Sequence, residues 1–540
     1  MNDCLFLPVE IAGIEFKNPF YVASGPTTRT VEQLLAIEKA GWAAASIKLS
    51  IDPPPYINRH PRYSLFKQYD ALGFTAEKRL TYDQGRLVIS EAKKKLNDLV
   101  LMANIAYSGE KGAQGWVDMA LGFEDAGADM IELNMCCPNM SFNVQVTSGD
   151  KDVINQRTGA SIGQDEEVVT EVVGAIKSKL TVPLIVKLTP EYGGIGSVAK
   201  AAYLAGADAV SGTAGRLGIP PIDLEHPEKS TFHLQDEVGM VCLCGAWIKP
   251  LALRDTYEIR LACGPETPIF ATGGVRNAHD ALETAMCGGD MIGICTETLI
   301  RGYNFIGDIV AETKKWLVSH GYKNLNDIRD RIVPAVKSAP ELTLWRGHAK
   351  VVKPDLIAPC RAVCPKGIDI QAVLKKISQG DKLRAYQLAA GSEACEGCSA
   401  PCEKSCVRGR ADGALSIKKI LTNLRADAKI KGVDITMCAE DNHKDRAVSK
   451  AADVLSNRSI RNIGVFPDAS SWLEESASRC LKCGCGEGCA TCSEICCEFA
   501  VTINEQSRIA IDSSRCVACG MCFNCCPNKN IQMFNTGETL

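Results

Sequence analysis

The sequence predicts an α/β protein with a (β/α)8 barrel followed by cysteine-rich domains, and two observations lead to this fold class. Short apolar segments alternate with helix-like segments over about the first 320 of its 540 residues. The cysteines are unevenly spread, since residues 1–359 hold 8 of the 27 and residues 360–540 hold 19. A hydrophobic content of 46% and a charged content of 23% exclude disorder or a coiled coil as the main architecture.

Eight segments of the first region are near-continuous apolar runs, as expected for parallel strands that are buried on both faces. They span residues 20–25, 43–49, 99–105, 129–135, 183–189, 208–213, 268–274 and 290–295. Helical patterns separate them, for example at 31–41, 115–127, 166–180 and 278–289, and glycine closes several of these. Eight such units in this length favour a (β/α)8, or TIM, barrel. A doubly wound open sheet is the alternative that the pattern leaves open.

The sequence divides into three expected domains, at 1–345, 346–470 and 471–540. A charged, proline-containing stretch at 321–358 predicts a helix followed by a linker. Residues 360–430 show helical periodicity with cysteines at the turns, which predicts a helical domain. From residue 471 the cysteine density rises and the helical periodicity is lost, so a small ligand-rich domain is expected there.

The strongest local signal is a run of four cysteines near the C-terminus with the bacterial ferredoxin spacing C-x2-C-x2-C-x3-C-P. An imperfect second run precedes it, and a small hairpin is expected between the two. In two-cluster ferredoxins the fourth cysteine of a run binds the other cluster. The expected ligand sets are therefore Cys516, Cys519, Cys522 and Cys496 for one cluster, and Cys485, Cys489, Cys492 and Cys526 for the other. Structural zinc is the alternative, although zinc ribbons pair two C-x2-C hooks across a gap.

Eight further cysteines could bind two more [4Fe–4S] clusters, which would make four in total. They are Cys360, Cys364, Cys395, Cys398, Cys402, Cys406, Cys480 and Cys483. Two alternatives stay open: Cys485 could take the place of Cys483, or one cluster could be accompanied by spare buried thiols. No secretory signal and no membrane-spanning run is visible, so we expect a cytoplasmic protein, in which clustered cysteines indicate metal ligands rather than disulfides.

Polar and small residues gather where the predicted strands end, and the active sites of such barrels lie at those C-terminal ends. These candidates are Ala23, Ser24, Gly25, Lys48, Asn104, Asn134, Lys187, Gly273, Gly274, Cys295 and Thr296. Two lysines directed at one site suit an anionic or electron-rich ligand. The pairs after the seventh and eighth strands lie where barrels commonly bind phosphate.

Taken together, these motifs resemble a known group of redox enzymes. The barrel resembles the FMN domain of dihydropyrimidine dehydrogenase and of its relative dihydroorotate dehydrogenase. The cysteine pattern at 360–406 and the phrase ASRCLKC resemble the helical cluster domain of the glutamate synthase small subunit and dihydropyrimidine dehydrogenase. The resemblance implies an FMN and iron–sulfur oxidoreductase that reduces or forms an activated C=C bond. It assigns FMN contacts to Lys48, Asn134, Lys187, Thr213, Gly245, Gly274 and Thr296.

The resemblance also supplies a candidate catalytic residue. The stretch Asn134-Met-Cys-Cys-Pro-Asn139 resembles the family element N-x-SCP-x-G. Cys137 aligns with the cysteine that acts there as general acid/base on the substrate carbon. The alternative is that Cys137 is only a small buried hydrophobic residue. The polar loop at 138–164 is long enough to be expected as a lid.

The sequence departs from the family pattern at the positions that bind the substrate. The Asn-Thr pair expected after strand 6 is replaced by Thr213-Ala214-Gly215-Arg216, and Glu110 stands where an asparagine is expected after strand 3. Only Asn134 remains among the residues that read the substrate amides. Because a site that lacks such partners loses selectivity, the substrate need not be a pyrimidine. Arg216 is instead a candidate contact for a carboxylate or another anion.

A nicotinamide-binding unit is not recognisable in the sequence. The near match Gly194-x-Gly196-x2-Ala199 lacks a surrounding βαβ unit with an acidic residue at the right offset. We therefore expect a separate FAD/NAD(P)-binding or other redox subunit, and an oligomeric assembly. The net charge of −4 argues against nucleic acid as a partner. An electron-transfer subunit without an organic substrate of its own is the alternative function.

Overall fold

The computed structural model contains two compact units, Met1–Lys337 and Ser338–Leu540. The residues it describes are 7–54, 58–75, 77–137, 159–189, 193–212, 215–354, 356–389, 392–410, 413–430, 469–486, 489–506 and 508–539. The expected lid, at 138–164, lies largely outside this range. The three-domain division of the sequence stays a prediction.

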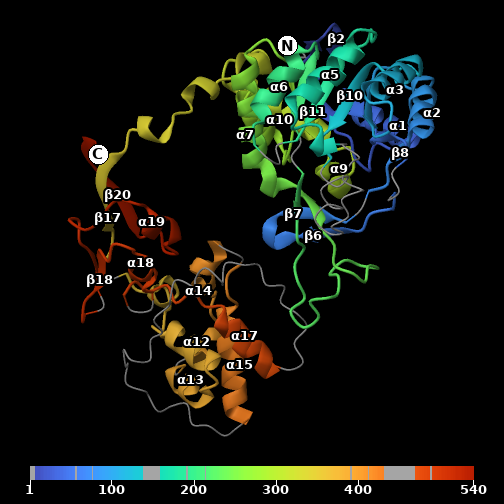
Figure 1. Cartoon of the computed structure of the whole chain (residues 1–540). Coiled ribbons are helices and arrows are strands. Elements are labelled where there is room, and N and C mark those ends of the chain that lie inside the picture. Colours follow the sequence, from blue (N-terminus) through green and yellow to red (C-terminus); the bar gives the residue numbers. More distant parts are fainter. Residues whose placement is uncertain are drawn as a thin grey trace, which may run out of the picture. The chain divides into compact units, whose positions relative to one another are not determined.

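The first unit is a closed (β/α)8 barrel, as the sequence predicts (Figure 1). Its eight parallel strands follow one another around the barrel, and β10 closes it by pairing with β9 as well as with β11. The strands are β3 (Phe20–Val22), β4 (Ala44–Ser46), β9 (Val100–Tyr107), β10 (Met130–Met135), β11 (Leu184–Leu188), β12 (Ala209–Gly212), β15 (Ile269–Thr272) and β16 (Met291–Ile294). The closure excludes the open doubly wound sheet.

Helices cover the outside of the barrel, and their apolar residues form one large core with the strands. They are α1 (Val31–Ala40), α2 (Tyr82–Lys93), α3 (Ala113–Asp125), α5 (Glu166–Lys177), α6 (Ile195–Leu204), α7 (Lys249–Cys263), α8 (Ala278–Met286), α9 (Thr296–Arg301) and α10 (Ile306–Ser319). Local signals explain their ends: Thr30 and Gln33 form a capping box on α1, and Gly41 ends that helix at φ 100°.

A hairpin at the N-terminus, β1 (Val9–Ile11) with β2 (Ile14–Phe16), helps to fill one end of the barrel. Its Ile11 and Phe16 side chains pack in a second core with Tyr21 and Phe270 from the strands. Phe270 meets both aromatic rings edge-on. This end is packed with apolar side chains, whereas polar residues are found at the other end.

An antiparallel sheet, not expected from the sequence, lines the cavity end of the barrel. It contains β13 (Arg216–Gly218), β14 (Val241–Cys244), β7 (Ala71–Phe74) and β6 (Tyr63–Phe66), in that order. The short strands β5 (Ser50–Asp52) and β8 (Leu80–Thr81) extend the barrel sheet beside β9. These strands arise from insertions between barrel units, and they contribute walls to the cavity described below.

The second unit has a helical part and a small part with strands. The helices are α11 (Pro359–Ala362), α12 (Ile370–Ser378), α13 (Lys382–Leu388), α14 (Pro401–Lys404), α15 (Ile417–Ile430) and α17 (Ala469–Ser478). The other part contains β17 (Trp345–Val351), α18 (Thr491–Glu494), β18 (Val501–Ile503), β19 (Ile509–Ile511), α19 (Met521–Cys525) and β20 (Ile531–Thr539). The expected hairpin is β18 with β19. Strand β17 pairs with β20, at the other end of this unit's sequence.

Candidate active site and thiol groups

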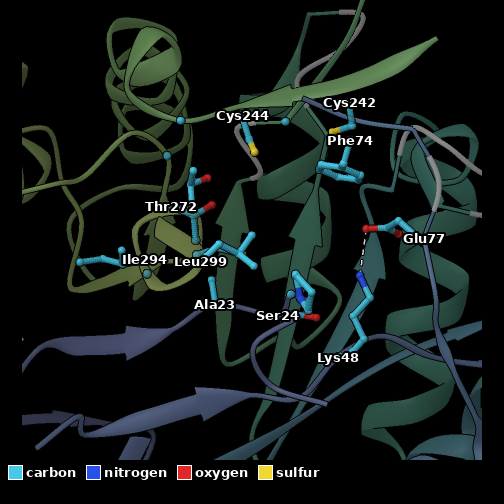
Figure 2. A pocket seen from close by; sticks show the side chains of 18 of the residues that line it. Ala23, Ser24, Lys48, Phe74, Glu77, Cys242, Cys244, Thr272, Ile294 and Leu299 are labelled. Atoms are coloured by element: carbon cyan, nitrogen blue, oxygen red, sulfur yellow. Dashed lines mark hydrogen bonds and ion pairs between the residues drawn. The ribbon is translucent and has the colours of Figure 1, made fainter. Parts of the chain in front are cut away.

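A cavity of about 340 Å³ lies at the C-terminal ends of the barrel strands, within the usual size range of cofactor and ligand pockets (Figure 2). Most of the residues proposed from the sequence line it. They are Ala23, Ser24, Gly25, Lys48, Asn134, Cys137, Lys187, Gly245, Gly273, Gly274, Cys295 and Thr296. The closure of the barrel therefore brings together residues that are up to about 270 positions apart in the sequence.

Two further candidates, Asn104 and Arg216, do not line this cavity as the sequence suggested. Asn104 is fully buried within β9 and supports two lining residues from behind the cavity: it accepts from Asn134 Nδ2 at 2.9 Å and donates to Glu132, the partner of Lys187. Arg216 pairs with Asp255 at 3.2 Å and is not among the lining residues, so its expected role as an anion contact has no support. Thr213 lies outside the described residues.

The thiol of Cys137 belongs to a compact charged cluster. Glu77 Oε2 lies 3.6 Å from Cys137 Sγ, and Arg79 Nη2 lies 3.9 Å from the same sulfur. The other oxygen of Glu77 binds Lys48 Nζ at 2.9 Å, as Figure 2 shows. Four groups from three chain segments thus surround one edge of the cavity.

These neighbours set the protonation of the cluster. Burial alone would raise the pKa of Glu77, but Lys48 and Arg79 outweigh it and lower that pKa to about 2. Burial raises the pKa of Cys137, and the Glu77 carboxylate raises it further against the opposing effect of Arg79. At neutral pH the site therefore holds a carboxylate beside a protonated thiol, and a thiolate formed there would have two cations nearby.

A second buried charge lies below the cavity. Lys187 of β11 faces Glu132 of β10 at 3.7 Å, and Glu132 also accepts a hydrogen bond from Ser46 at 2.5 Å. Burial alone would lower the pKa of Lys187, but Glu132 outweighs it and raises that pKa. Lys187 is therefore a fixed cation at the cavity floor, suited to an electron-rich ring.

The backbone around the cavity leaves room for a flat ligand. A Cβ atom at Gly25 would lie 2.4 Å from Cys295 Sγ, so a side chain there would clash with the opposite wall. Gly274 has φ +73°, and its Cβ would lie 2.8 Å from the backbone nitrogen of Lys249. Glycine at both positions, with Lys187 and Asn134 beside them, fits the binding of a planar cofactor such as FMN.

Two charged residues beside Cys137 were not expected from the sequence: Glu77, which lines the cavity, and Arg79, which is not a lining residue but contacts the Cys137 thiol. Other unexpected lining residues with polar or aromatic side chains include Arg29, His60, Tyr63, Phe74, Lys78, Thr272, Arg276 and Glu297. Several of them come from the insertion at 58–79, which has no strong periodicity. The charged triplet Glu77-Lys78-Arg79, directly before the apolar Leu80, was the available signal.

The proposed cysteine ligands of the second unit are grouped in space. In the helical part, burial raises the pKa of Cys360, and the nearby thiols of Cys480 and Cys406 raise it further. Burial likewise raises the pKa of Cys402 to about 11, with Cys364 and Cys395 among the groups that add to it. The segment at 480 thus meets the segment at 360 across about 120 residues.

The ferredoxin-like part shows the same grouping. Cys485, Cys489, Cys492 and Cys526 line one small internal cavity. Burial raises the pKa of Cys522, and Cys516, Cys519 and Cys496 lie close enough to influence it. Both sets are those expected from the ferredoxin spacing, with the fourth cysteine of each run exchanged.

The chemistry of the donor set bears on the kind of metal. The grouped side chains proposed as ligands in this unit are all cysteines, and soft thiolate ligands suit iron–sulfur clusters. The four-cysteine groups of the ferredoxin-like part match the number of ligands of one [4Fe–4S] cluster each.

Comparison with known proteins places the barrel in a family. Residues 6–317 match the family model described as dihydroorotate dehydrogenase. The NAD-dependent dihydropyrimidine dehydrogenase subunit PreA of Escherichia coli is 27% identical over 341 residues, 61% of this chain and 78% of that protein. The chloroplastic dihydropyrimidine dehydrogenase (NADP(+)) of Arabidopsis thaliana is 24% identical over 60% of this chain and 76% of that protein.

A third relative is the catalytic subunit of dihydroorotate dehydrogenase B (NAD(+)) from Pyrococcus abyssi, at 29% identity over 60% of this chain and 97% of that protein. In the described part of the chain, none of the helices is long and apolar enough to cross a membrane. The cysteine-rich second unit lies outside the family match, and its composition fits iron–sulfur domains. The chain belongs to the dihydroorotate dehydrogenase family and is a flavin-dependent oxidoreductase acting on CH–CH bonds.

Proposed function

We propose that this protein uses FMN and [4Fe–4S] clusters to reduce or form an activated C=C bond, with Cys137 as the proton donor or acceptor. The observation that carries the proposal is the contact of the Cys137 thiol with Glu77 and Arg79 at the edge of the cavity. A protonated, buried thiol beside a fixed cation can both give up a proton and tolerate the resulting negative charge.

The cavity residues divide into those that would hold FMN and those that would act on the substrate. Lys187, Asn134, Gly245 and the Gly273–Gly274 turn would hold the cofactor, with Thr296 near its phosphate. When bound, FMN supplies the hydride transfer to or from carbon.

Cys137 provides the proton that completes a reduction. Its Sγ–H bond breaks, the proton moves to the substrate carbon, and the sulfur keeps the electron pair as a thiolate. Arg79 stabilises that thiolate directly, and Lys48 does so through Glu77. In the reverse direction the thiolate takes the proton from carbon, so the same residues serve either direction.

The substrate is expected to differ from a simple pyrimidine. The one remaining amide reader, Asn134, already uses its Oδ1 for the backbone N–H of Cys137 at 3.2 Å and its Nδ2 for Asn104. The facing wall is instead aromatic, with Tyr63 and Phe74 on neighbouring strands. A conjugated, partly apolar enone or enoate fits this wall, whereas the relatives named above are described as acting on dihydropyrimidine or dihydroorotate.

Electrons would travel between the flavin and a partner through four [4Fe–4S] clusters held by the sixteen cysteines proposed from the sequence. Clusters of this type supply one-electron transfer. Two of the relatives are themselves named as subunits of NAD-dependent enzymes, which supports a separate nicotinamide-binding partner here.

An anaerobic screen of pyrimidines, enones and enoates against the reduced protein tests the proposal. With an active compound in hand, Cys137→Ala should lower turnover by about 10²–10⁴-fold while the flavin content stays unchanged. Cys287→Ala, at the end of α8 and outside the cavity, is the matched control and should keep full turnover. Unchanged turnover in Cys137→Ala would refute the acid role.

The engagement of Asn134 also favours a second candidate, an electron-transfer subunit without an organic substrate. In that case no compound in the screen should oxidise the reduced flavin or perturb its spectrum, and a stable complex with a redox partner should form.

A further inference from the structure

The two cysteine runs of the ferredoxin-like part are related by sequence but not equal at the positions that follow them. In the first run, the residues two and four positions after Cys496 are Glu498 and Ala500. In the second run, the residues two and four positions after Cys526 are Asn528 and Asn530. Only the second run therefore carries amide side chains at these two places.

Both amides donate to the same sulfur. Asn528 Nδ2 and Asn530 Nδ2 each lie 3.3 Å from Cys485 Sγ. The backbone N–H of Asn530 also donates to Cys526 Sγ at 3.2 Å. Three N–H donors thus face two thiols of one expected cluster.

In the part of the chain that the structure describes, the corresponding thiols of the other set receive hydrogen bonds from backbone N–H groups. Ala500 N donates to Cys496 Sγ at 3.3 Å, which matches the Asn530–Cys526 contact in the second run. Ala349 N donates to Cys516 Sγ at 3.3 Å. The set that contains Cys485 therefore differs by its side-chain partners: two amides on Cys485, and the Thr491 hydroxyl 3.3 Å from Cys489 Sγ.

The donors are held firmly in place. Asn530 is only 5% exposed, and its amide binds the backbone of Lys353 in both directions, accepting from its N–H at 2.9 Å and donating to its carbonyl at 2.8 Å. Asn528 donates in addition to the carbonyl of Cys483. Rigid donors gain more from added charge on a sulfur than donors that must first be oriented.

Burial and hydrogen bonding have opposite effects on the reduction potential of this expected cluster. Cys485, Cys489 and Cys492 are at most 7% exposed, whereas Cys519 of the other set is exposed. Reduction adds a negative charge, so a buried cluster is harder to reduce, and N–H···S hydrogen bonds make it easier.

We infer that Asn528 and Asn530 are positioning residues that raise the reduction potential of the cluster bound by Cys485, Cys489, Cys492 and Cys526. They offset the effect of its burial and keep this cluster usable in the same electron chain as its more exposed neighbour. The inference rests on the proposed cluster content.

Redox titration of the anaerobically purified full-length protein, followed by electron paramagnetic resonance, tests this. Asn530→Ala copies the residue of the other run and keeps the backbone donor. Together with Asn528→Ala it should shift one cluster potential to a more negative value, by about a tenfold change in the reduction equilibrium, or about 59 mV for one electron. The remaining potentials should not move.

Asn535→Ala is the matched control, because Asn535 is an exposed asparagine of β20, the strand that directly follows Asn530, and its side chain accepts from Gly537 N. Asn530→Ala also breaks the contact with Lys353 and could lose iron for that reason. In that case the single variant Asn528→Ala provides the test, and its cluster potential should shift in the same direction by a smaller amount. Unchanged potentials at full iron content would overturn the inference, whereas wild-type protein without the expected iron would instead refute the proposed cofactors.

Discussion

The two units of this protein differ in the relation between their core and their chemistry. In the barrel, the core consists of apolar side chains from strands and helices, and the reactive groups lie at the end of a framework that is complete without them. In the second unit, proposed ligands such as Cys360, Cys483, Cys485 and Cys522 are themselves members of the small apolar cores.

This difference indicates that the barrel depends on packing and the second unit on its metal. A large apolar core can stabilise a site that is still empty. A small core in which thiols occupy central positions buries too little apolar surface to be stable without the metal. Cluster binding and folding should therefore be coupled. The predictions below test this contrast, from the largest effect to the smallest.

Iron removal should produce the largest difference in stability between the two units. After anaerobic chelation, residues 338–540 should lose most of their protection against hydrogen exchange and proteolysis, because their cores lose the groups that join the thiols. Residues 1–337 should keep theirs. Equal protection of both units after complete iron loss would contradict the contrast.

Loss of one ligand should have a smaller, local effect. Cys516→Ser should remove one cluster and lower the iron content from about sixteen to about twelve per chain, while flavin binding persists. Cys497→Ser is the control, since Cys497 is exposed and outside the proposed ligand sets. Iron near four in the unchanged protein would refute the four-cluster assignment.

The barrel should instead be sensitive to buried polar contacts. Arg260 of α7 is 3% exposed, donates to the carbonyl of Gly288 at 2.6 Å and pairs with Asp290 at 2.8 Å. Arg260→Met should lower the free energy of unfolding of the barrel by about 1–3 kcal/mol, because it removes the donor to the buried Gly288 carbonyl and leaves Asp290 paired with Arg329. Denaturant titration followed by tryptophan fluorescence measures this.

A matched control lies on the same helix. Arg254 pairs with Glu258 on the exposed side, and Arg254→Met should change the free energy of unfolding by less than about 1 kcal/mol. A similar loss in both variants would show that the barrel does not depend on the buried network.

The smallest effect concerns the pH dependence of turnover. The Glu77 carboxylate raises the pKa of Cys137, and Glu77→Gln removes that negative neighbour while Arg79 and Lys48 remain. The thiol should then ionise at lower pH, so the alkaline limit of C=C reduction should move to lower pH. Glu110→Gln, an exposed position outside the cavity, is the control. If the alkaline limit of turnover stays in place or moves to higher pH, Glu77 does not control the ionisation of Cys137.

Features that depend on local sequence patterns could be predicted, whereas contacts between residues far apart in the sequence could not. All eight barrel strands were predicted within a few residues of their ends, because buried parallel strands leave continuous apolar runs. The sheet that contains β6, β7, β13 and β14 was not, since its strands are short and partly exposed. The ion pair of Arg216 could not be predicted, because its partner Asp255 lies on a helix 39 positions away, at a spacing that no local pattern encodes.

The sequence by itself determined the barrel and the expected ligand sets of the two ferredoxin-like clusters. Both follow from short-range regularities: alternating apolar segments in one case and cysteines three to four residues apart in the other. Tertiary structure alone decided that Glu77 and Arg79 contact Cys137, and that Asn528 and Asn530 both reach Cys485. These contacts join residues 43 to 60 positions apart, and they exist because packing of the surrounding strands and turns fixes distances that spacing along the chain leaves free.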